Sequence, residues 1–380
     1  MPTRCARCSR RRWSRPQGAS RGTLLPPEPF AARIAAWQRT HGRHDLPWQD
    51  TRDPYRRWIS EIMLQQTQVA AVIPYYRRFM ERFPDVQALA SAGLDEVLQA
   101  WSGLGYYSRA RNLHAAALAV CAQGGFPTSA AQLERLPGIG RSTAAAIAVF
   151  AGGERAAILD GNVRRVLCRH RGVEGFPGTP AVERRLWTIA EDALPEPADL
   201  EAYTQGLMDL GATVCTRARP GCAACPVAAD CVALATARVA ELPAPRPRRE
   251  IPLRETAMLL FSARGAVLLE RRPPAGIWGG LWSLPEAREE EADAVARSLG
   301  LAVLATRRLE PFLHRFTHFG LRVQPLLLEV EAAALHEAGP GPERRWLPLA
   351  DAGAAALPRP VKTLLTGLGA AGLRERCGAG

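Results

Sequence analysis

Lysine is almost absent from this chain: Lys362 is the only one, and the other 48 of its 49 cationic residues are arginines. Schiff-base chemistry by a lysine is therefore excluded from any active site built from residues 1–361. No apolar run reaches the roughly 18 residues that a membrane-spanning helix needs. Acidic residues are fewer than basic ones, 37 against 49, and the net charge of +12 favours a polyanionic partner.

Four of the nine cysteines lie close together, with the spacing C-x6-C-x2-C-x5-C at Cys215, Cys222, Cys225 and Cys231. In a chain of otherwise intracellular character, four neighbouring thiols predict a soft metal centre rather than disulfides. Zinc sites usually combine two separate CxxC pairs, or cysteine with histidine. One CxxC with unequal gaps instead suits a [4Fe–4S] cluster held by four thiolates. A disulfide, or four unrelated cysteines, is the alternative.

The first two thirds of the chain are predicted to be mostly α-helical. Residues 1–27 carry seven arginines and no acid, and predict a basic disordered tail. Through 28–235, apolar residues recur at spacings of three and four, which predicts a helical domain that includes the cysteine loop 215–231. One such stretch predicts a helix over 58–80, with Asp53 and Pro54 as its start signal.

The last third has a different pattern. Residues 236–253 are rich in proline and charge and predict a linker between two independent cores. An α+β domain is expected over 254–372, before a tail at 373–380. Within it, 256–272 predicts two strands about a glycine turn, and 319–332 predicts a further strand pair.

A glycine-rich turn between two helices is the first segment that carries chemistry. It reads LPGIGRSTA over 136–144. Backbone N–H groups at such a helix start bind one DNA phosphate without reading base sequence. A plain turn is the alternative. The residues that we single out for DNA binding are Leu136, Gly138, Ile139, Gly140 and Ser142.

The second segment is ILDGNVRRV, over 158–166, which brings Asp160 to the start of the next helix. Backbone N–H groups and the helix dipole at that position favour the ionised carboxylate. Asp-Gly-Asn is also an ordinary turn signal, so Asp160 alone would not indicate function.

Taken together, these parts resemble the helix-hairpin-helix DNA glycosylases that carry an iron–sulfur cluster, over about residues 30–235. Within that superfamily the chain is similar to the adenine DNA glycosylases of the MutY type. The segments that carry the resemblance are LPWQ (46–49), SEIMLQQTQVAAVIPYY (60–76), WSGLGYYSRARNLH (101–114), LPGIGRSTA, LDGNVRRVLCR (159–169) and MDLGATVC (208–215).

The resemblance implies roles for three residues of the active site. Glu61 matches the acid that protonates N7 of a flipped-out adenine, and its apolar neighbours favour a raised pKa. Asp160 matches the carboxylate that stabilises the oxocarbenium-like sugar. Asn162 would orient the water or Asp160. One acid held protonated and one held ionised is the usual division of labour at glycosidic bonds.

The resemblance also implies contacts to DNA. Gln205 matches an adenine-contacting position. Gln66 and Tyr106 match groups that fill the gap left by a flipped base; for Tyr106 the alternative is plain core packing. In the bifunctional endonuclease III relatives a strand-cleaving lysine stands where this chain has Ser142. We therefore expect base removal without strand cleavage.

The C-terminal domain resembles the Nudix fold through GIWGGLWSLPE (276–286). A Nudix hydrolase needs paired glutamates for magnesium, but Arg297 and Ser298 stand where that pair belongs. The resemblance implies a domain that reads 8-oxoguanine, through a loop with Phe316, Thr317 and His318. An amphipathic strand without that role is the alternative.

The sequence therefore predicts a monofunctional adenine DNA glycosylase that acts on adenine opposite 8-oxoguanine or guanine. We expect a monomer with a [4Fe–4S] cluster, working on double-stranded DNA in a bacterial cytoplasm at the nucleoid. The alternatives are another helix-hairpin-helix glycosylase, a Nudix hydrolase with a DNA-binding appendage, and a DNA-binding protein without activity. The acid at Glu61 disfavours the first, the missing glutamates the second, and the pair Glu61 and Asp160 the third.

Overall fold

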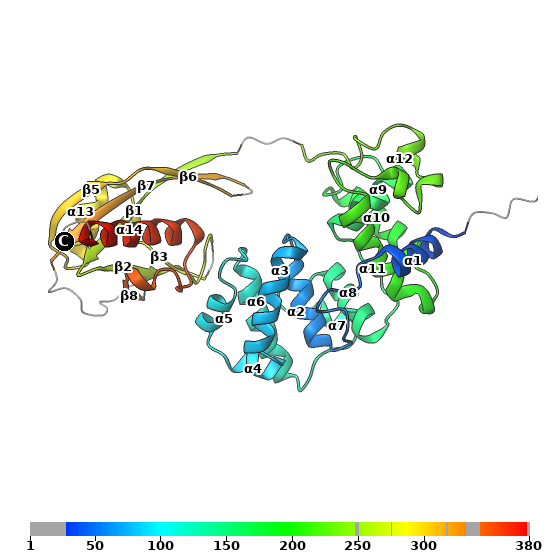
Figure 1. The fold of residues 1–380 in the computed structure, drawn as a ribbon, viewed down its shortest axis with the longest axis horizontal. Helices are drawn as coiled ribbons and strands as arrows, with labels where there is room; N and C mark the ends of the chain where they lie inside the picture. The colour runs from blue at the N-terminus through cyan, green and yellow to red at the C-terminus, as the bar shows by residue number, and fades with distance from the viewer. Residues whose placement is uncertain (1–27, 248–250, 275, 317, 332–342, 378–380) are drawn as a thin grey trace, which may run out of the picture.

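The computed structural model describes residues 28–247, 251–274, 276–316, 318–331 and 343–377 (Figure 1). The predicted tail 1–27 and Thr317 lie outside the described residues. No helix in the described part of the chain is both long and apolar enough to cross a membrane.

Helices make up the first part of the chain, as predicted. The α-helices are α1 (Phe30–His41), α2 (Pro54–Leu64), α3 (Val69–Arg82), α4 (Val86–Ser91), α5 (Leu94–Ala100), α6 (Ser108–Ala122), α7 (Ala130–Leu133), α8 (Arg141–Gly152), α9 (Gly161–Arg171), α10 (Pro180–Asp192), α11 (Leu200–Asp209) and α12 (Val232–Ala235). A π-helix, η2 (Leu210–Val214), continues α11. Short 3-10 turns cover Pro197–Asp199, Cys222–Ala224 and Ala228–Asp230.

Two buried clusters of apolar side chains organise these helices. One lies among α2 to α8, and Trp58, Phe79 and Trp101 are its largest members. The other joins α1 to α9, α10 and α11. Helix α8 contributes to both, with Ile147 in the first and Val149 in the second. The two clusters therefore meet at α8. Both candidate acids lie on elements that pack against this helix.

The helix predicted over 58–80 is wrong as a single element. Asp53 does cap its start by accepting a hydrogen bond from the Tyr55 N–H at 2.9 Å. However, α2 ends at Leu64 and α3 begins at Val69, and Gln66 between them has a left-handed φ of 56°. The polar run at 65–68 offers no apolar side chain to continue the buried stripe, so the chain turns there instead.

A mixed sheet forms the C-terminal domain. Its strands are β1 (Leu253–Ala263), β2 (Ala266–Arg271), β3 (Trp282–Ser283), β4 (Glu286–Ala287), β5 (Val303–Arg308), β6 (Phe312–Arg315), β7 (Gly320–Val330) and β8 (Arg344–Pro348). The central path runs β3-β2-β1-β7-β5, and β1 and β7 are parallel. Strands β1 and β2 form the predicted hairpin about Gly265. The strand pair predicted over 319–332 is wrong, because one long strand, β7, runs through Gly320–Val330.

Two helices cover the two faces of this sheet. Alternate residues of β1 face opposite cores, Met258 with α14 (Arg359–Cys377) and Leu259 with α13 (Ala292–Ser298). Helix α14 runs into the tail predicted over 373–380. The α+β architecture is thus an α/β/α sandwich, as Figure 1 shows for α13 and α14.

The C-terminal domain packs against the helical part, although the sequence predicts two cores isolated by a linker. Leu281 and Ala356 are buried in the same apolar cluster as α2 to α8. Arg271 forms an ion pair with Asp95 of α5 at 2.7 Å, and Arg111 of α6 donates to the Gly279 carbonyl. The two parts therefore have a built interface beside α5 and α6.

Candidate active site

Glu61 lies near the end of α2 with its side chain partly buried. Its neighbours Ser60, Ile62 and Met63 are buried in the helical core. Burial and, to a smaller extent, the nearby carboxylate Asp160 raise the pKa of Glu61 to about 7, although the Arg57 guanidinium lowers it. A carboxyl of this kind holds its proton near neutral pH and can act as a general acid.

Asp160 is the N-cap of α9 and accepts a hydrogen bond from the Val163 N–H at 2.8 Å. Asn162 donates its amide Nδ2 to the second carboxylate oxygen at 3.4 Å. The expectation of an easily ionised group is only partly met. Burial raises the pKa of Asp160 above its ordinary value, although these hydrogen bonds and the charge of Arg165 lower it. Because each acid is near the other, loss of one proton makes loss of the second harder.

A cavity of about 400 Å³ lies between α1, α2, α8 and α11. Arg57, one helical turn before Glu61, lines this cavity, whereas Glu61 and Asp160 are not among its lining residues. Gln205 lines it and is buried, with its Nε2 donating to the buried carboxylate of Asp209 at 2.8 Å. Arg43 binds the same carboxylate through its backbone N–H and its side chain. Since the Gln205 amide nitrogen donates to Asp209, the amide oxygen of Gln205 remains available to the cavity.

The glycine-rich turn lies where α7 leads into α8. Gly138 has a left-handed φ of 78°, and a Cβ there would meet the Asn112 side chain at 2.7 Å, so the turn requires glycine. Leu136 and Ile139 are buried in the core, and Gly140 is the N-cap of α8. The Ser142 hydroxyl accepts a hydrogen bond from the Leu159 N–H at 2.9 Å, which ties the turn to the strand-like segment before Asp160.

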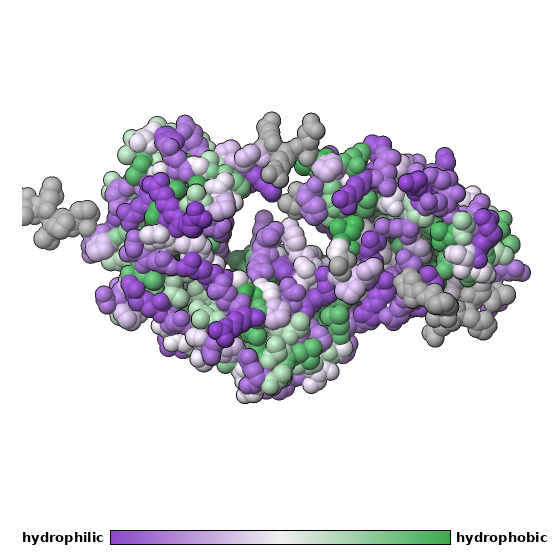
Figure 2. Space-filling view, turned by 180° about the vertical axis from the view of Figure 1, so that it is seen from behind, coloured by the Kyte–Doolittle hydropathy of each residue, from purple (hydrophilic) through white to green (hydrophobic). Residues whose placement is uncertain are grey.

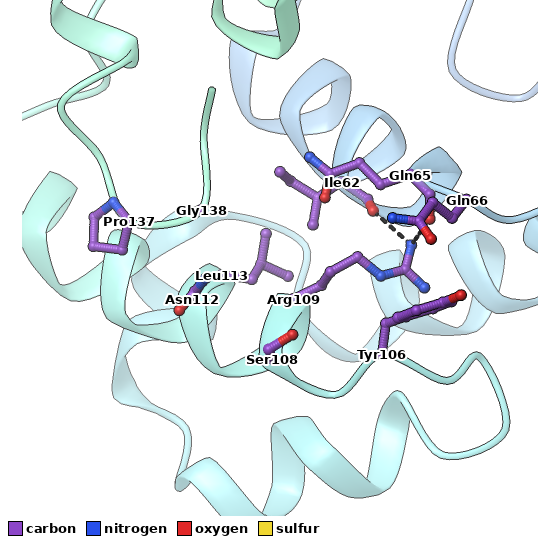
Figure 3. Close-up of a pocket in the computed structure, with 10 residues that line it drawn as sticks. All are labelled: Ile62, Gln65, Gln66, Tyr106, Ser108, Arg109, Asn112, Leu113, Pro137 and Gly138. Atoms are coloured by element: carbon purple, nitrogen blue, oxygen red, sulfur yellow. Dashed lines mark hydrogen bonds between the residues drawn. The ribbon is translucent and has the colours of Figure 1, made fainter. Parts of the chain in front are cut away.

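Gln66 and Tyr106 each stand on a turn with left-handed backbone, at φ 56° and 49°. Tyr106 is 51% exposed, which rules out plain core packing. Both residues border a cavity of about 230 Å³, together with Pro137 and Gly138 of the glycine-rich turn (Figure 3). The two residues predicted to enter the base stack and the glycine-rich turn therefore border one cavity.

Arg109 holds these two turns together. Its Nη1 donates to the carbonyls of Ile62, Met63 and Gln65, at 2.9, 2.9 and 2.6 Å. Its Nη2 donates to the Thr67 hydroxyl and the Gly105 carbonyl, and its guanidinium lies 5.5 Å from the Tyr106 ring centroid. Figure 3 shows the side chain reaching between the end of α2 and Tyr106. The guanidinium satisfies carbonyls that the break after α2 leaves free.

Comparisons with known proteins follow the same division of the chain. Residues 59–192 match the HhH-GPD superfamily of base excision DNA repair proteins, and residues 256–367 match the NUDIX domain. An adenine DNA glycosylase of Buchnera aphidicola is 33% identical over 88% of this chain and 96% of its own length. The adenine DNA glycosylase of Homo sapiens is 36% identical over 84% of this chain and 70% of its own length.

The chain belongs to the adenine DNA glycosylase family. It is a base excision repair enzyme, and its chemistry is hydrolysis of an N-glycosyl bond. Its helical part is also similar to a thermostable thymine-DNA glycosylase of known structure, with 29% identity and a TM-score of 0.50. That likeness covers 55% of this chain and 95% of the other.

The four cysteines of this glycosylase line one small cavity between α9, α12 and the loops that join them. All four are free thiols, and Val214, Pro220 and Leu234 give the cavity apolar walls. Arg169 points its Nη1 to the Cys215 sulfur at 3.4 Å. Within the described residues, no three histidine, cysteine or acidic side chains are close enough together to hold one metal ion. Four thiols on one cavity are nevertheless the donor set that a [4Fe–4S] cluster takes.

One arginine connects the cysteine loop to the candidate catalytic turn. Arg165 donates its Nε to the Cys215 carbonyl at 2.7 Å, and its Nη2 to the Asn162 side chain at 2.8 Å. Its Nη2 also donates to the Gly211 carbonyl. A Cβ on Gly211 would lie 2.5 Å from the Asn162 Cβ. The close approach of the π-helix to this turn therefore requires glycine at position 211.

The predicted reading loop follows β6 in the glycosylase's second domain. Phe316 is partly buried, with its ring 4.5 Å from Phe319 and 5.4 Å from Trp278. His318 is exposed. Trp278 also packs against the helical core, so it contacts both the loop and the other domain. Phe316 of the loop therefore contacts Trp278, which itself lies at the interface between the two domains.

Sequence reasoning missed several residues that the structure brings to the site. They are Arg57, Arg109, Arg165 and Asp209, of which Asp209 is fully buried and Arg57 and Arg109 are nearly so. Arginine is the common cation of this chain, so composition hides the buried ones. One signal for Arg57 was present in the sequence, which is its spacing from Glu61. Arg57 stands four residues before Glu61, so the two residues share a helix face.

Proposed function

We propose that this glycosylase removes adenine paired with 8-oxoguanine or guanine, and leaves the DNA backbone intact. The observation that carries the proposal is the pair Glu61 and Asp160. The two carboxyls influence each other electrostatically, and the pKa of Glu61 is raised to about 7. Arg57, one turn before Glu61 on the same helix, lines the cavity of about 400 Å³. Such a pair divides the work at a glycosidic bond between a proton donor and a charge stabiliser.

In the proposed reaction the adenine leaves the base stack and enters the cavity. Glu61 donates its proton to N7, and the N9–C1′ bond breaks with its electron pair going to the base. Asp160, as carboxylate, stabilises the positive charge on the sugar, which lowers its own pKa at that moment. Water then adds to C1′ and gives up a proton to a carboxylate. Asn162, fixed by Arg165, keeps Asp160 oriented.

Two features support base removal without strand cleavage. Ser142 is occupied by its hydrogen bond from the Leu159 N–H. The chain's single lysine, Lys362, lies on α14 and donates to Ser102 at 3.4 Å, in the contact between the two domains. No amine of a lysine is thus on hand to attack C1′.

A duplex would lie across the opening between the helical part and the C-terminal domain (Figure 2). The glycine-rich turn would bind a phosphate, and Gln66 and Tyr106 would occupy the stack. Phe316, Thr317 and His318 would contact the base opposite the adenine. We infer a monomer, acting on nucleoid DNA in a bacterial cytoplasm.

We also propose that Cys215, Cys222, Cys225 and Cys231 hold a [4Fe–4S] cluster. When bound, such a cluster supplies a rigid anchor for the loop, and through Arg165 this loop supports the turn of Asp160 and Asn162. Purified protein should contain about four irons per chain. Stoichiometric zinc without iron would contradict this assignment.

The experiment for the proposed function compares Glu61→Gln with the unchanged chain on an A:8-oxoguanine duplex. The variant should bind the duplex but excise adenine on the order of 10²–10⁴ times more slowly in single turnover, the usual contribution of a general acid. Glu81→Gln, on the exposed surface of α3, is the matched control and should be unaffected. A near-normal rate for Glu61→Gln would refute the role of Glu61.

A further inference from the structure

Arg57 is a buried cation in the wall of the cavity proposed for the base. It is 3% exposed, and it stands one helical turn before Glu61 on α2. The cavity of about 400 Å³ is lined by Arg57 together with Gln49, Phe150, Glu201 and Gln205. Since i and i+4 residues share a helix face, Arg57 and Glu61 point to the same side of α2.

Two of its nitrogens are fixed by backbone. The Nε donates to the Thr51 carbonyl at 2.8 Å, and Nη2 donates to the Gln49 carbonyl at 3.0 Å. The guanidinium carbon lies 4.9 Å from the centroid of the Phe150 ring. Nη1 has no hydrogen-bond partner within the described part of the chain. It is also not one of the fully buried polar atoms that lack a partner. A rigid donor is thus left facing the cavity.

Its charge is also poorly balanced. The nearest carboxylate is that of Glu201, at 3.9 Å from Nη2, and the Glu201 side chain is 47% exposed. Burying a cation without a close counter-ion is costly, so the position needs a reason other than stability. The charge also lowers the pKa of Glu61, against the effect of burial and of Asp160. The poorly balanced charge of Arg57 and its effect on the pKa of Glu61 both favour a negative charge beside Arg57 in the cavity.

We propose that Arg57 is a further catalytic residue, whose Nη1 donates a hydrogen bond to N1 or N3 of the extruded adenine. This rests on the proposed function, which assigns N7 to Glu61. When the N9–C1′ bond breaks, its electron pair enters the base and the proton of Glu61 moves to N7. Arg57 stabilises both the electron-rich base and the new carboxylate of Glu61. These charges exist only as the bond breaks, so the interaction accelerates the chemical step.

The test uses the full-length chain with three variants, Arg57→Leu, Arg57→Lys and the matched control Arg56→Leu. Arg56 lies on the same helix, but its side chain is 46% exposed. We expect Arg57→Leu to slow single-turnover excision from A:8-oxoguanine by roughly 10- to 100-fold, as for loss of a hydrogen bond to a charged group. Arg57→Lys should lie in between, and Arg56→Leu should match the unchanged chain.

Base analogues separate contact with adenine from support of the fold. Duplexes with 1-deazaadenine and 3-deazaadenine each remove one acceptor. The unchanged chain should lose rate with one of them beyond the loss seen with the other, and Arg57→Leu should show no such extra loss. Melting temperature and binding of an abasic-site duplex check that Arg57→Leu is folded. If it is not, Arg57→Lys takes its place in the analogue comparison, with a smaller extra loss expected.

Two outcomes would overturn the proposal. One is an Arg57→Leu rate equal to that of the unchanged chain. The other is a slower variant that keeps the full sensitivity to both analogues, which would assign Arg57 to holding the Gln49 and Thr51 carbonyls. If the unchanged chain excises adenine while either result is found, only this inference fails. If the unchanged chain excises no adenine, the proposed function fails first and this inference with it.

Discussion

At the residue scale, the chemistry of the site is set by where its charges are buried. Glu61 has apolar neighbours in sequence, and this alone predicts a raised pKa. Asp160 follows the opposite expectation, since a helix start favours ionisation. In the structure burial outweighs the helix start, and the pKa of Asp160 is also raised. The sequence identifies the backbone N–H donors at a helix start, but it does not show how deeply the neighbouring carboxyl group is buried.

The pH dependence of excision follows from these two shifts. Glu61 must hold its proton to act, so single-turnover rates should fall as pH rises through about 7. Asp160 must be ionised, and because its pKa is raised, the acid limb should lie above the usual value of about 3.9. A pH profile on an A:8-oxoguanine duplex measures both limbs. A rate that stays level as the pH falls to about 3.9, or one that stays level beyond about pH 8.5, would contradict the assignment.

Stability should respond to the same residue. A folded-state pKa above the unfolded value means that Glu61 contributes stability below about pH 4, which is lost as pH rises through about 7. Glu61→Gln removes the ionisable group. Denaturant titration at pH 8 should therefore find the variant more stable than the unchanged chain, by on the order of 1–3 kcal/mol. An equal or lower stability of the variant at pH 8 would argue against a buried Glu61.

At the element scale, sequence reasoning fails at the break between α2 and α3, where Gln66 is proposed to enter the base stack. The periodicity of apolar residues predicts that helices exist, and α1, α6, α8, α9 and α10 are found as expected. It does not predict the turn at Gln66, because the donor for the free carbonyls of α2 is Arg109, more than 40 residues away. Long-range capping of this kind has no local signal.

Arg109 should therefore control the insertion of both turns into DNA. Arg109→Lys keeps the charge but cannot reach both turns, since a lysine amine lacks the fork of a guanidinium. With 2-aminopurine in place of adenine, the rise in fluorescence on base flipping should shrink severalfold. Arg77→Lys, on the exposed face of α3, is the control. An unchanged fluorescence response in Arg109→Lys would exclude a positioning role.

At the scale of the whole molecule, the sequence predicts two domains and the order in which they occur, and the folds of both agree with the structure. It does not predict their contact. The linker composition suggests independent cores, yet Leu281 and Ala356 are buried with the helical core. An interface depends on the shapes of two finished surfaces, and neither Arg271 nor Asp95 has a sequence neighbour that marks it as a partner.

The interface should transmit recognition of the opposite base. Arg271→Ala removes the ion pair with Asp95 and leaves the reading loop intact. We expect adenine excision opposite guanine to stay nearly constant, while the preference for 8-oxoguanine over guanine falls. Arg322→Ala, which breaks an exposed ion pair with Glu255 inside the C-terminal domain, is the matched control. If both variants keep the full preference, the orientation of the domain does not matter to recognition.

The central claim is removal of adenine without strand cleavage, and one assay addresses it directly. A duplex with a single A:8-oxoguanine pair, labelled on the adenine strand, is incubated with the protein and divided in two. Only the half treated with hot alkali should show a strand break, at the adenine, because the abasic product is cut by alkali and not by the protein. No break after alkali would contradict glycosylase action on adenine, and a break before alkali would contradict the monofunctional mechanism.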